Sequence, residues 1–181
     1  ILNYNEINRW LNQLCLNDIN IRDMFNSVGS GMTGEYSLDH KGDTLFVAEM
    51  LMYINNNNYD GYDSDILDDV LGPYPSGKVN ISSGDKDMTK KIFKIMADGC
   101  SQYDIRKLKK FTKSSFYNLF YTISFILQKG NIWGKKKDID GQYKIVNPAL
   151  FVKWFFDEEF KRINAPGTKI AYKNAKGTTK Y

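Results

Sequence analysis

The sequence predicts a mainly α-helical fold (α+β, with one short two-stranded hairpin) in which an acidic module precedes a basic one. Apolar residues recur at helical spacing through most of the 181 residues. The net charge of +4 conceals a division, because residues 1–85 carry 13 acidic and four basic side chains, whereas residues 86–181 carry eight acidic and 21 basic ones. Glycine and proline gather at residues 72–84, where the charge changes sign. The expected parts are an acidic helical module (1–72), a linker (73–86), a basic domain (87–163) and a flexible basic tail (164–181).

The composition excludes several classes of protein. An aromatic content of 14% and a hydrophobic content of 42% supply enough apolar surface for a core, so the chain is not fully disordered. No window reaches the roughly 18 uninterrupted apolar residues of a membrane-spanning helix. Cys15 and Cys100 are too few for a disulfide framework or a zinc site, and His40 is the single histidine. We expect no cofactor, no metal and no membrane partner. The first residues resemble neither a signal nor a transit peptide, which favours a cytoplasmic location.

The acidic half is expected to form four helices. Their apolar residues recur three and four positions apart, as Ile7, Leu11 and Leu14 do in the first, which places them on one helix face. Thr44 is expected to cap the third helix. The run of four asparagines that starts at Asn55 is expected to end it, since asparagine competes for backbone hydrogen bonds. The expected helices span residues 3–16, 19–25, 44–54 and 63–71.

The basic half has a different order of elements. Gly99 is expected to end its first helix, and Ser101 to cap a short second helix, with Asp104 completing a Ser-x-x-acid capping box. Thr112 is expected to cap a long third helix, which Gly130 closes. An Asp-Gly turn signal lies between two strand-like runs. The expected helices span residues 87–98, 102–110, 113–128 and 149–162, and the expected strands span 131–133 and 142–146 around a tip at 134–141.

Helix, short helix, turn, longer helix and two-stranded hairpin follow one another in the order of a winged helix-turn-helix. Four segments add a resemblance in sequence: residues 101–108, 112–116, 127–132 and 141–148, the last reading Gly-Gln-Tyr-Lys-Ile-Val-Asn-Pro. Together they resemble the winged-helix core of plasmid- and phage-type replication proteins and related bacterial regulators, over roughly residues 86–156. The resemblance implies sequence-specific binding of double-stranded DNA, without catalysis, by a replication initiator or transcription regulator associated with the nucleoid.

The long helix of the basic half is the expected DNA-reading element. An α-helix fits the major groove of B-DNA, where its exposed side chains reach base edges. Asn118 would contact adenine through two hydrogen bonds, and Ser114 lies near the helix N-terminus, which suits a phosphate. Lysines in the preceding turn and at the hairpin tip would neutralise phosphates on either side. The expected DNA-binding residues are Lys107, Lys109, Lys110, Thr112, Lys113, Ser114, Tyr117, Asn118, Tyr121, Lys135, Lys136 and Lys137.

Several of these residues also have ordinary structural interpretations. Runs of lysine are usually solvated, and asparagine is common on exposed helix faces. Tyr117 and Tyr121 would equally extend the core or form a dimer interface. Trp154, Phe155 and Phe156 exceed what one helix face buries alone, so they either cover the core or form the surface of a homodimer.

The acidic half offers two further candidates, each with a simpler interpretation. Asp39 and His40 are residue types found in hydrolase and nuclease sites, but no second histidine, cysteine partner or Gly-rich phosphate loop accompanies them, which favours a polar loop. The aspartates between Asp60 and Asp69 lack the glycine and glutamate of a calcium loop, which favours a solvated acidic face. The acidic module would supply dimerisation or bind a protein partner.

Two other functions remain open. A winged helix can serve as a docking fold, which would make the chain a protein–protein adaptor. Residues 2–7 and the helical pattern after them also resemble the helical region downstream of the ParB-like domain in modification-dependent restriction enzymes. The Asp-Gly-Gln-Gln-Arg stretch of that catalytic part is absent, so a fragment of this kind would be inactive.

Overall fold

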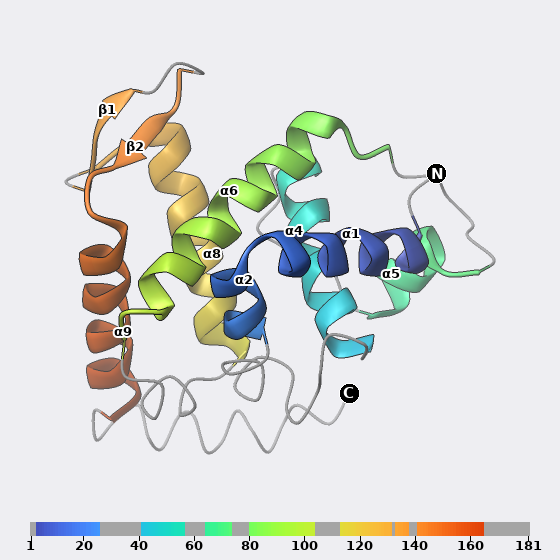
Figure 1. Ribbon diagram of the computed structural model, residues 1–181, viewed down its shortest axis with the longest axis horizontal. Coiled ribbons are helices and arrows are strands. Elements are labelled where there is room, and N and C mark those ends of the chain that lie inside the picture. The colour runs from blue at the N-terminus through green and yellow to red at the C-terminus, as the bar shows by residue number, and fades with distance from the viewer. Residues whose placement is uncertain are drawn as a thin grey trace.

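The described part of the protein is mainly α-helical, as the sequence predicts (Figure 1). The computed structural model describes residues 3–25, 41–56, 64–73, 80–103, 113–131, 133–137 and 141–164. Within these ranges no helix is both long and apolar enough to cross a membrane. The helices are α1 (Tyr4–Asn17), α2 (Ile19–Asp23), α4 (Lys41–Asn56), α5 (Ser64–Leu71), α6 (Ser83–Cys100), α8 (Lys113–Lys129) and α9 (Pro148–Asn164), and the strands are β1 (Gly134–Lys137) and β2 (Tyr143–Ile145).

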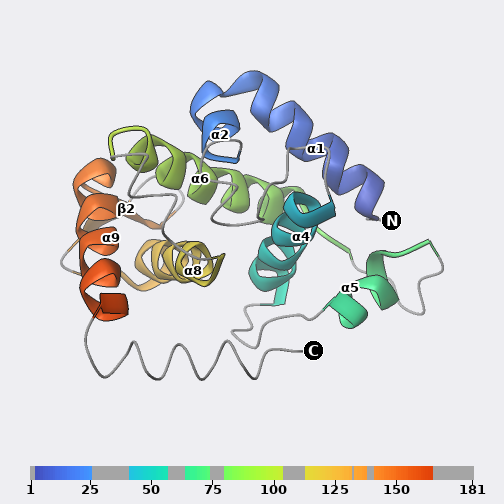
Figure 2. The ribbon, with the colours of Figure 1, turned by 90° about the horizontal axis from the view of Figure 1, so that it is seen from below.

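Helix α6 lies at the centre of the arrangement (Figures 1 and 2). Helix α2 packs on one side of it and helices α4 and α8 on the other, while α9 packs along it near its C-terminal end. A helix with neighbours on several sides needs apolar residues on more than one face. Helix α6 meets this need with seven buried residues: Thr89, Ile92, Phe93, Met96, Ala97, Gly99 and Cys100.

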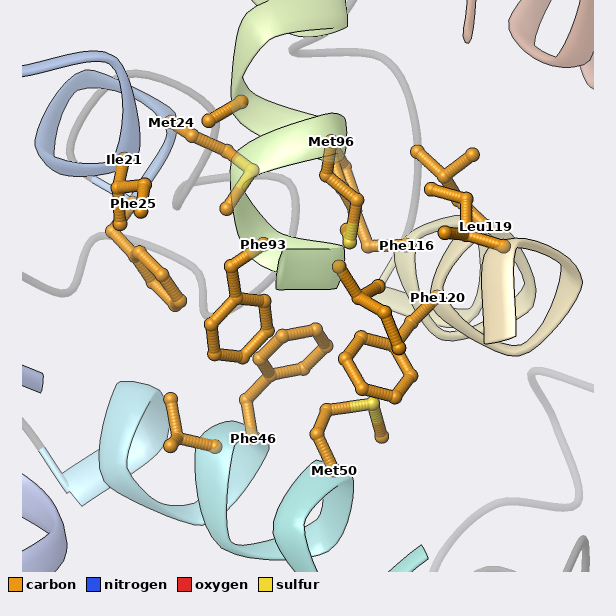
Figure 3. Packing of buried hydrophobic residues seen from close by; sticks show 14 of the residues in the cluster. Ile21, Met24, Phe25, Phe46, Met50, Phe93, Met96, Phe116, Leu119 and Phe120 are labelled. Atoms are coloured by element: carbon orange, nitrogen blue, oxygen red, sulfur yellow. The ribbon is translucent and has the colours of Figure 1, made fainter. Parts of the chain in front are cut away.

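A cluster of buried aromatic rings joins the acidic and basic halves in one core (Figure 3). The ring of Phe93 on α6 lies 5.6 Å from that of Phe25, 6.3 Å from that of Phe46 and 5.6 Å from that of Phe120, between ring centroids. Phe25 follows α2 and Phe46 belongs to α4, so both come from the acidic half. The change of charge along the sequence is therefore not a boundary in packing.

Helix α6 begins earlier and ends later than the sequence predicts. Ser82 and Asp85 form a capping box, in which each side chain accepts a hydrogen bond from the other residue's backbone N–H. Gly99, which is expected to end the helix, lies inside it. Its lack of a side chain allows α9 to pack closely at this point, since a Cβ atom at Gly99 would lie 2.4 Å from Cβ of Val152. Ser101, expected to cap the next helix, is instead the C-cap of α6. That next helix, from residue 104 on, lies outside the described residues.

The start of α6 is also tied to the end of α4. Asn55 donates hydrogen bonds of 3.0 Å to Oδ2 of Asp85 and to the carbonyl oxygen of Asn80. Partial burial acts to raise the pKa of Asp85, but the hydrogen bonds from Asn55 and Ser82 outweigh it, so the pKa lies below its ordinary value. The charged carboxylate therefore holds these two helix ends together.

Helix α8 and the hairpin after it follow the expected order. Gly130 closes α8 at a positive φ of 72°, and its N–H donates to the carbonyl oxygen of Ile126. Strands β1 and β2 pair antiparallel, with Lys136 opposite Lys144. The prediction of a first strand at residues 131–133 is wrong, because the side chain of Asn131 accepts the N–H of Trp133 and forms a turn there. The strand starts at Gly134, within the segment expected to be the tip.

The remaining helices agree with the predicted spans to within a few residues. Helices α1, α2, α5 and α9 begin and end close to their expected positions. Helix α4 begins at Lys41 instead of Thr44, and Thr44 is a buried residue of the helix, not its cap. Most of the expected loop at 29–42, residues 74–79 of the expected linker, and the tail after residue 164 lie outside the described residues.

The contact of α6 with α9 predicts a strong effect of adding one methyl group at residue 99. We expect Gly99→Ala to lower the free energy of unfolding by about 1–3 kcal/mol, because the new Cβ overlaps Val152. Gly84→Ala is the matched control, since the nearest atom to a Cβ there is Oγ of Ser82 at 3.5 Å, and it should stabilise the helix. Urea denaturation measures both. The loss should shrink in a Val152→Gly background, which removes the Cβ atom that the new methyl group overlaps, and an unchanged loss there would contradict this explanation.

Candidate nucleic-acid interface

Helix α8 keeps one face open among the described elements, although it has neighbours on three sides. Its buried residues face α6, α9 and β2. Seen from below, α8 lies between α9 and α4, with α6 across from its open face (Figure 2). We call the residues along this open face the α8 stripe. Their spacing of three and four positions puts them on one line along the helix. The α8 stripe comprises Ser114, Asn118, Thr122, Phe125 and Lys129.

The two polar residues expected on this face do lie there. Ser114 and Asn118 are exposed. The hydroxyl of Thr122 donates a 2.7 Å hydrogen bond to the carbonyl oxygen of Asn118, which fixes the orientation of the Thr122 side chain on the helix surface. Phe125 is 47% exposed, which is unusual for a residue of its size. The α8 stripe is therefore polar at its N-terminal end, apolar in the middle and basic at Lys129.

The two tyrosines expected beside Asn118 extend the core instead. The ring of Tyr117 lies 4.8 Å from that of Phe46, and the ring of Tyr121 lies 4.5 Å from that of Tyr53, both on α4. Burial raises the pKa of Tyr121 to about 12, and the charge of Glu49 adds to the shift. Burial raises the pKa of Tyr117 further, with Glu49 again adding to it. The expectation that these rings share the open face with Asn118 is therefore corrected, because α4 covers this side of α8.

Lysine positions gather where α8 meets the hairpin. Lys129 is exposed in the last turn of α8, and Gly130 after it lies against Tyr143 of β2. Lys144 is exposed on β2, and the strand register places it across from Lys136. On α6, Nζ of Lys91 donates a 3.0 Å hydrogen bond to Gln142 at the base of the hairpin. Strand β1 contributes three consecutive lysine positions, at Lys135, Lys136 and Lys137.

Elsewhere in the basic half, ion pairs balance much of the positive charge. Nζ of Lys94 on α6 lies 3.2 Å from Oδ2 of Asp18 and 3.6 Å from Oδ2 of Asp98. On α9 three basic residues each pair with an acidic residue of the same helix, so these six side chains contribute no net charge. The α9 pairs are Lys153–Asp157, Lys161–Glu158 and Arg162–Glu159. Lys129 and Lys144, on either side of the junction with the hairpin, have no ion pair among the described residues.

The other predicted DNA-binding positions lie outside what the structure describes. Lys107, Lys109, Lys110 and Thr112 belong to a segment that is not described, and Lys113 is placed by its backbone alone, as the first residue of α8. The sequence reasoning missed Thr122, Phe125, Lys129 and Lys144. Helical spacing from Asn118 would have found the first three, since they follow it by four, seven and eleven positions.

Most candidate metal and catalytic residues of the acidic half lie outside the described part of the chain. Asp39, His40, Asp60 and Asp63 lie outside it, and Asp68 accepts a 2.7 Å hydrogen bond from the hydroxyl of Tyr4. Throughout the described part of the chain, no three histidine, cysteine, aspartate or glutamate side chains form a group that could hold a metal ion. The thiols of Cys15 and Cys100 are buried, and burial raises the pKa of Cys100 to about 12.

Neither a family model, nor a curated protein, nor a solved structure matches this chain.

The different environments of Tyr117 and Asn118 predict opposite results for two neighbouring substitutions. We expect Tyr117→Ala to cost about 3 kcal/mol or more of unfolding free energy, because it opens a cavity between α8 and α4. Asn118→Ala should change stability by less than about 0.5 kcal/mol, since its side chain is exposed. Chemical denaturation followed by circular dichroism measures both. Similar losses for the two variants would show that α4 does not cover this side of α8.

Proposed function

We propose that this chain binds double-stranded DNA in a sequence-specific manner, through the α8 stripe and the β1–β2 hairpin. The observation that carries the proposal is an open helix face that exposes polar residues and Phe125 and ends beside a group of lysine positions. The order α6, α8, β1 and β2 supports a winged helix-turn-helix in which the hairpin serves as the wing. Helix α8 would then be the recognition helix.

The α8 stripe has the chemistry and spacing needed to read base edges. A helix about 10–12 Å across enters the major groove of B-DNA, which is about 12 Å wide. Asparagine recognises adenine through N6 and N7, a threonine hydroxyl bonds to several base edges, and a phenylalanine ring contacts the methyl group of thymine. Asn118, Thr122 and Phe125 occupy positions i, i+4 and i+7 of one face. This set favours target sites that contain A·T base pairs.

The lysines around the hairpin would supply affinity that does not depend on sequence. Lys129 and Lys144 are exposed, and β1 adds three lysine positions beside them. Lysines that neutralise phosphates release condensed cations from DNA, so each such contact makes binding weaker as salt rises. Ser114 lies near the N-terminal end of α8, where its hydroxyl would form a hydrogen bond to a phosphate or to a base edge.

Because α4 packs on α8, the acidic half would hold the recognition helix in position. Helix α4 would hold the recognition helix from one side through Tyr117 and Tyr121, and the negative charge of the acidic half would discourage DNA from approaching on that side. We propose no chemical reaction. The protein would act by its placement on DNA, as a replication initiator or a transcription regulator, and the acidic surface would be available to a protein partner.

Two exposed lysines test the contribution of the phosphates. We expect Lys129→Gln/Lys144→Gln to weaken binding to a fluorescein-labelled duplex of mixed sequence, and to reduce the slope of log K against log salt by about 0.9 for each lysine that touches a phosphate. Lys94→Gln is the matched control, because Asp18 and Asp98 already neutralise this lysine. Fluorescence anisotropy at several salt concentrations measures the slopes. Absence of duplex binding by the unaltered protein at about 50 mM salt would reject DNA binding and favour the adaptor function.

Asn118 tests base recognition separately. A target sequence is first selected from a random duplex library with the unaltered protein. We expect Asn118→Ala to lose about 1–3 kcal/mol of discrimination between this target and the mixed-sequence duplex, because a bidentate contact to a base disappears. The exposed Asn5 on α1 gives the matched control, Asn5→Ala. Equal discrimination by Asn118→Ala and the unaltered protein would place base recognition elsewhere.

A further inference from the structure

The outer face of α9 exposes large apolar side chains. Leu150 is 51% exposed, and Trp154 and Phe160 are each 43% exposed. The inner face of the same helix already supplies the core with Phe151, Val152 and Phe156, which are fully buried. Figures 1 and 2 both place α9 at the edge of the molecule, and no other described element lies against its outer face.

Two residues of the neighbouring segments enlarge this apolar surface. The ring of Trp133 lies 5.6 Å from that of Trp154. Val146 is 66% exposed, and its N–H donates a 3.2 Å hydrogen bond to the carbonyl oxygen of Trp133. Trp133, Val146 and Trp154 thus lie near one another where the hairpin meets α9, and Leu150 lies one turn before Trp154 on the same helix. Contiguous apolar surfaces of this kind mark protein interfaces, and tryptophan is enriched among the residues that dominate their energy.

The charges around this surface favour a protein partner over DNA. Lys153, Lys161 and Arg162 each pair with an acidic residue of α9, namely Asp157, Glu158 and Glu159. A DNA-binding surface carries excess positive charge, whereas these three pairs carry none. A balanced face of this kind is also complementary to itself, because each positive side chain has a negative counterpart a short distance along the helix.

We propose that α9 is the interface of a homodimer, in which two α9 helices pack antiparallel through their outer faces, about a two-fold axis at the level of residue 155 along the helix. Such an axis pairs positions equally far from residue 155. Leu150 and Phe160 are each five residues from it, so the two exposed apolar side chains meet across the interface. Lys153 and Asp157 are each two residues from it, so each lysine meets the aspartate of the partner subunit. Trp154 lies at the centre, where the most buried contacts of an interface form.

This register uses one face of the helix throughout. Steps of three and four connect these positions along two rows, 150, 153, 157 and 160, and 150, 154, 157 and 161, which is the pattern of residues that pack between helices. The self-complementary pairing is what an isologous two-fold interface requires, because each residue then contacts the same partner position in both subunits. The inference does not rest on DNA binding, although a dimer would present two copies of α8.

A charge exchange tests the register. Sedimentation velocity of the full chain between about 1 and about 100 μM is expected to show a monomer–dimer equilibrium. Lys153→Asp should weaken dimerisation about tenfold or more, since it sets carboxylates against each other across the axis. The double variant Lys153→Asp/Asp157→Lys restores the opposite charges and should recover the dimer. Lys90→Asp makes the same change at an exposed site on α6 and is the matched control.

Each outcome bears directly on the proposal. Weakening by Lys153→Asp, recovery by the double variant and no effect of Lys90→Asp would support it, with circular dichroism confirming that the variants fold. A chain that stays monomeric at about 100 μM would overturn it and leave the apolar surface to a different protein. A dimer that Trp154→Ala disrupts, but that ignores the charge exchange, would overturn the antiparallel register. Duplex binding by a strictly monomeric protein would reject the dimer and leave the proposed function intact.

Discussion

The position of Phe93 at the meeting point of three other rings is the constraint on which the structure depends. Its neighbours come from α4 and α8 and from Phe25 just after α2, so one side chain of α6 fixes three elements at once. Close packing of this kind tolerates little change in volume. Because α4 and α8 are held against α6 together, they also meet each other, and this contact decides which face of α8 remains open.

The electrostatic division of the sequence does not correspond to a division into two separately packed domains in the described part of the chain. The acidic and basic halves differ in charge but contribute to the same core. In the basic half, charge is balanced on α9 and at Lys94, whereas the exposed Lys129 and Lys144 beside the hairpin have no ion pair among the described residues. A net charge counted along the sequence therefore does not identify a binding surface, since ion pairs remove part of it and folding decides where the rest lies.

Helical spacing sufficed to predict most of the described helices. The errors occurred where a distant segment decides the outcome. Gly99 reads as a helix stop, but the demand for a close approach by Val152 outweighs it. Tyr117 and Tyr121 read as exposed because local spacing sets them off the apolar stripe, and only the presence of α4 makes them part of the core. Strand β1 is rich in lysine and has no alternating pattern, so nothing local marks it as a strand.

The aromatic cluster has a consequence for synthesis on the ribosome. Phe25 and Phe46 are synthesised before Phe93, the ring on which both pack in the finished core, and before Phe120, which packs on Phe93. Until then, of these rings, Phe25 and Phe46 can pack only on each other, and the faces that Phe93 and Phe120 later cover stay open to water or to chaperones. Contacts between residues so far apart also carry a high cost of loop closure, which slows folding. The amino-terminal helices therefore complete their tertiary packing only after the second half of the chain has been synthesised.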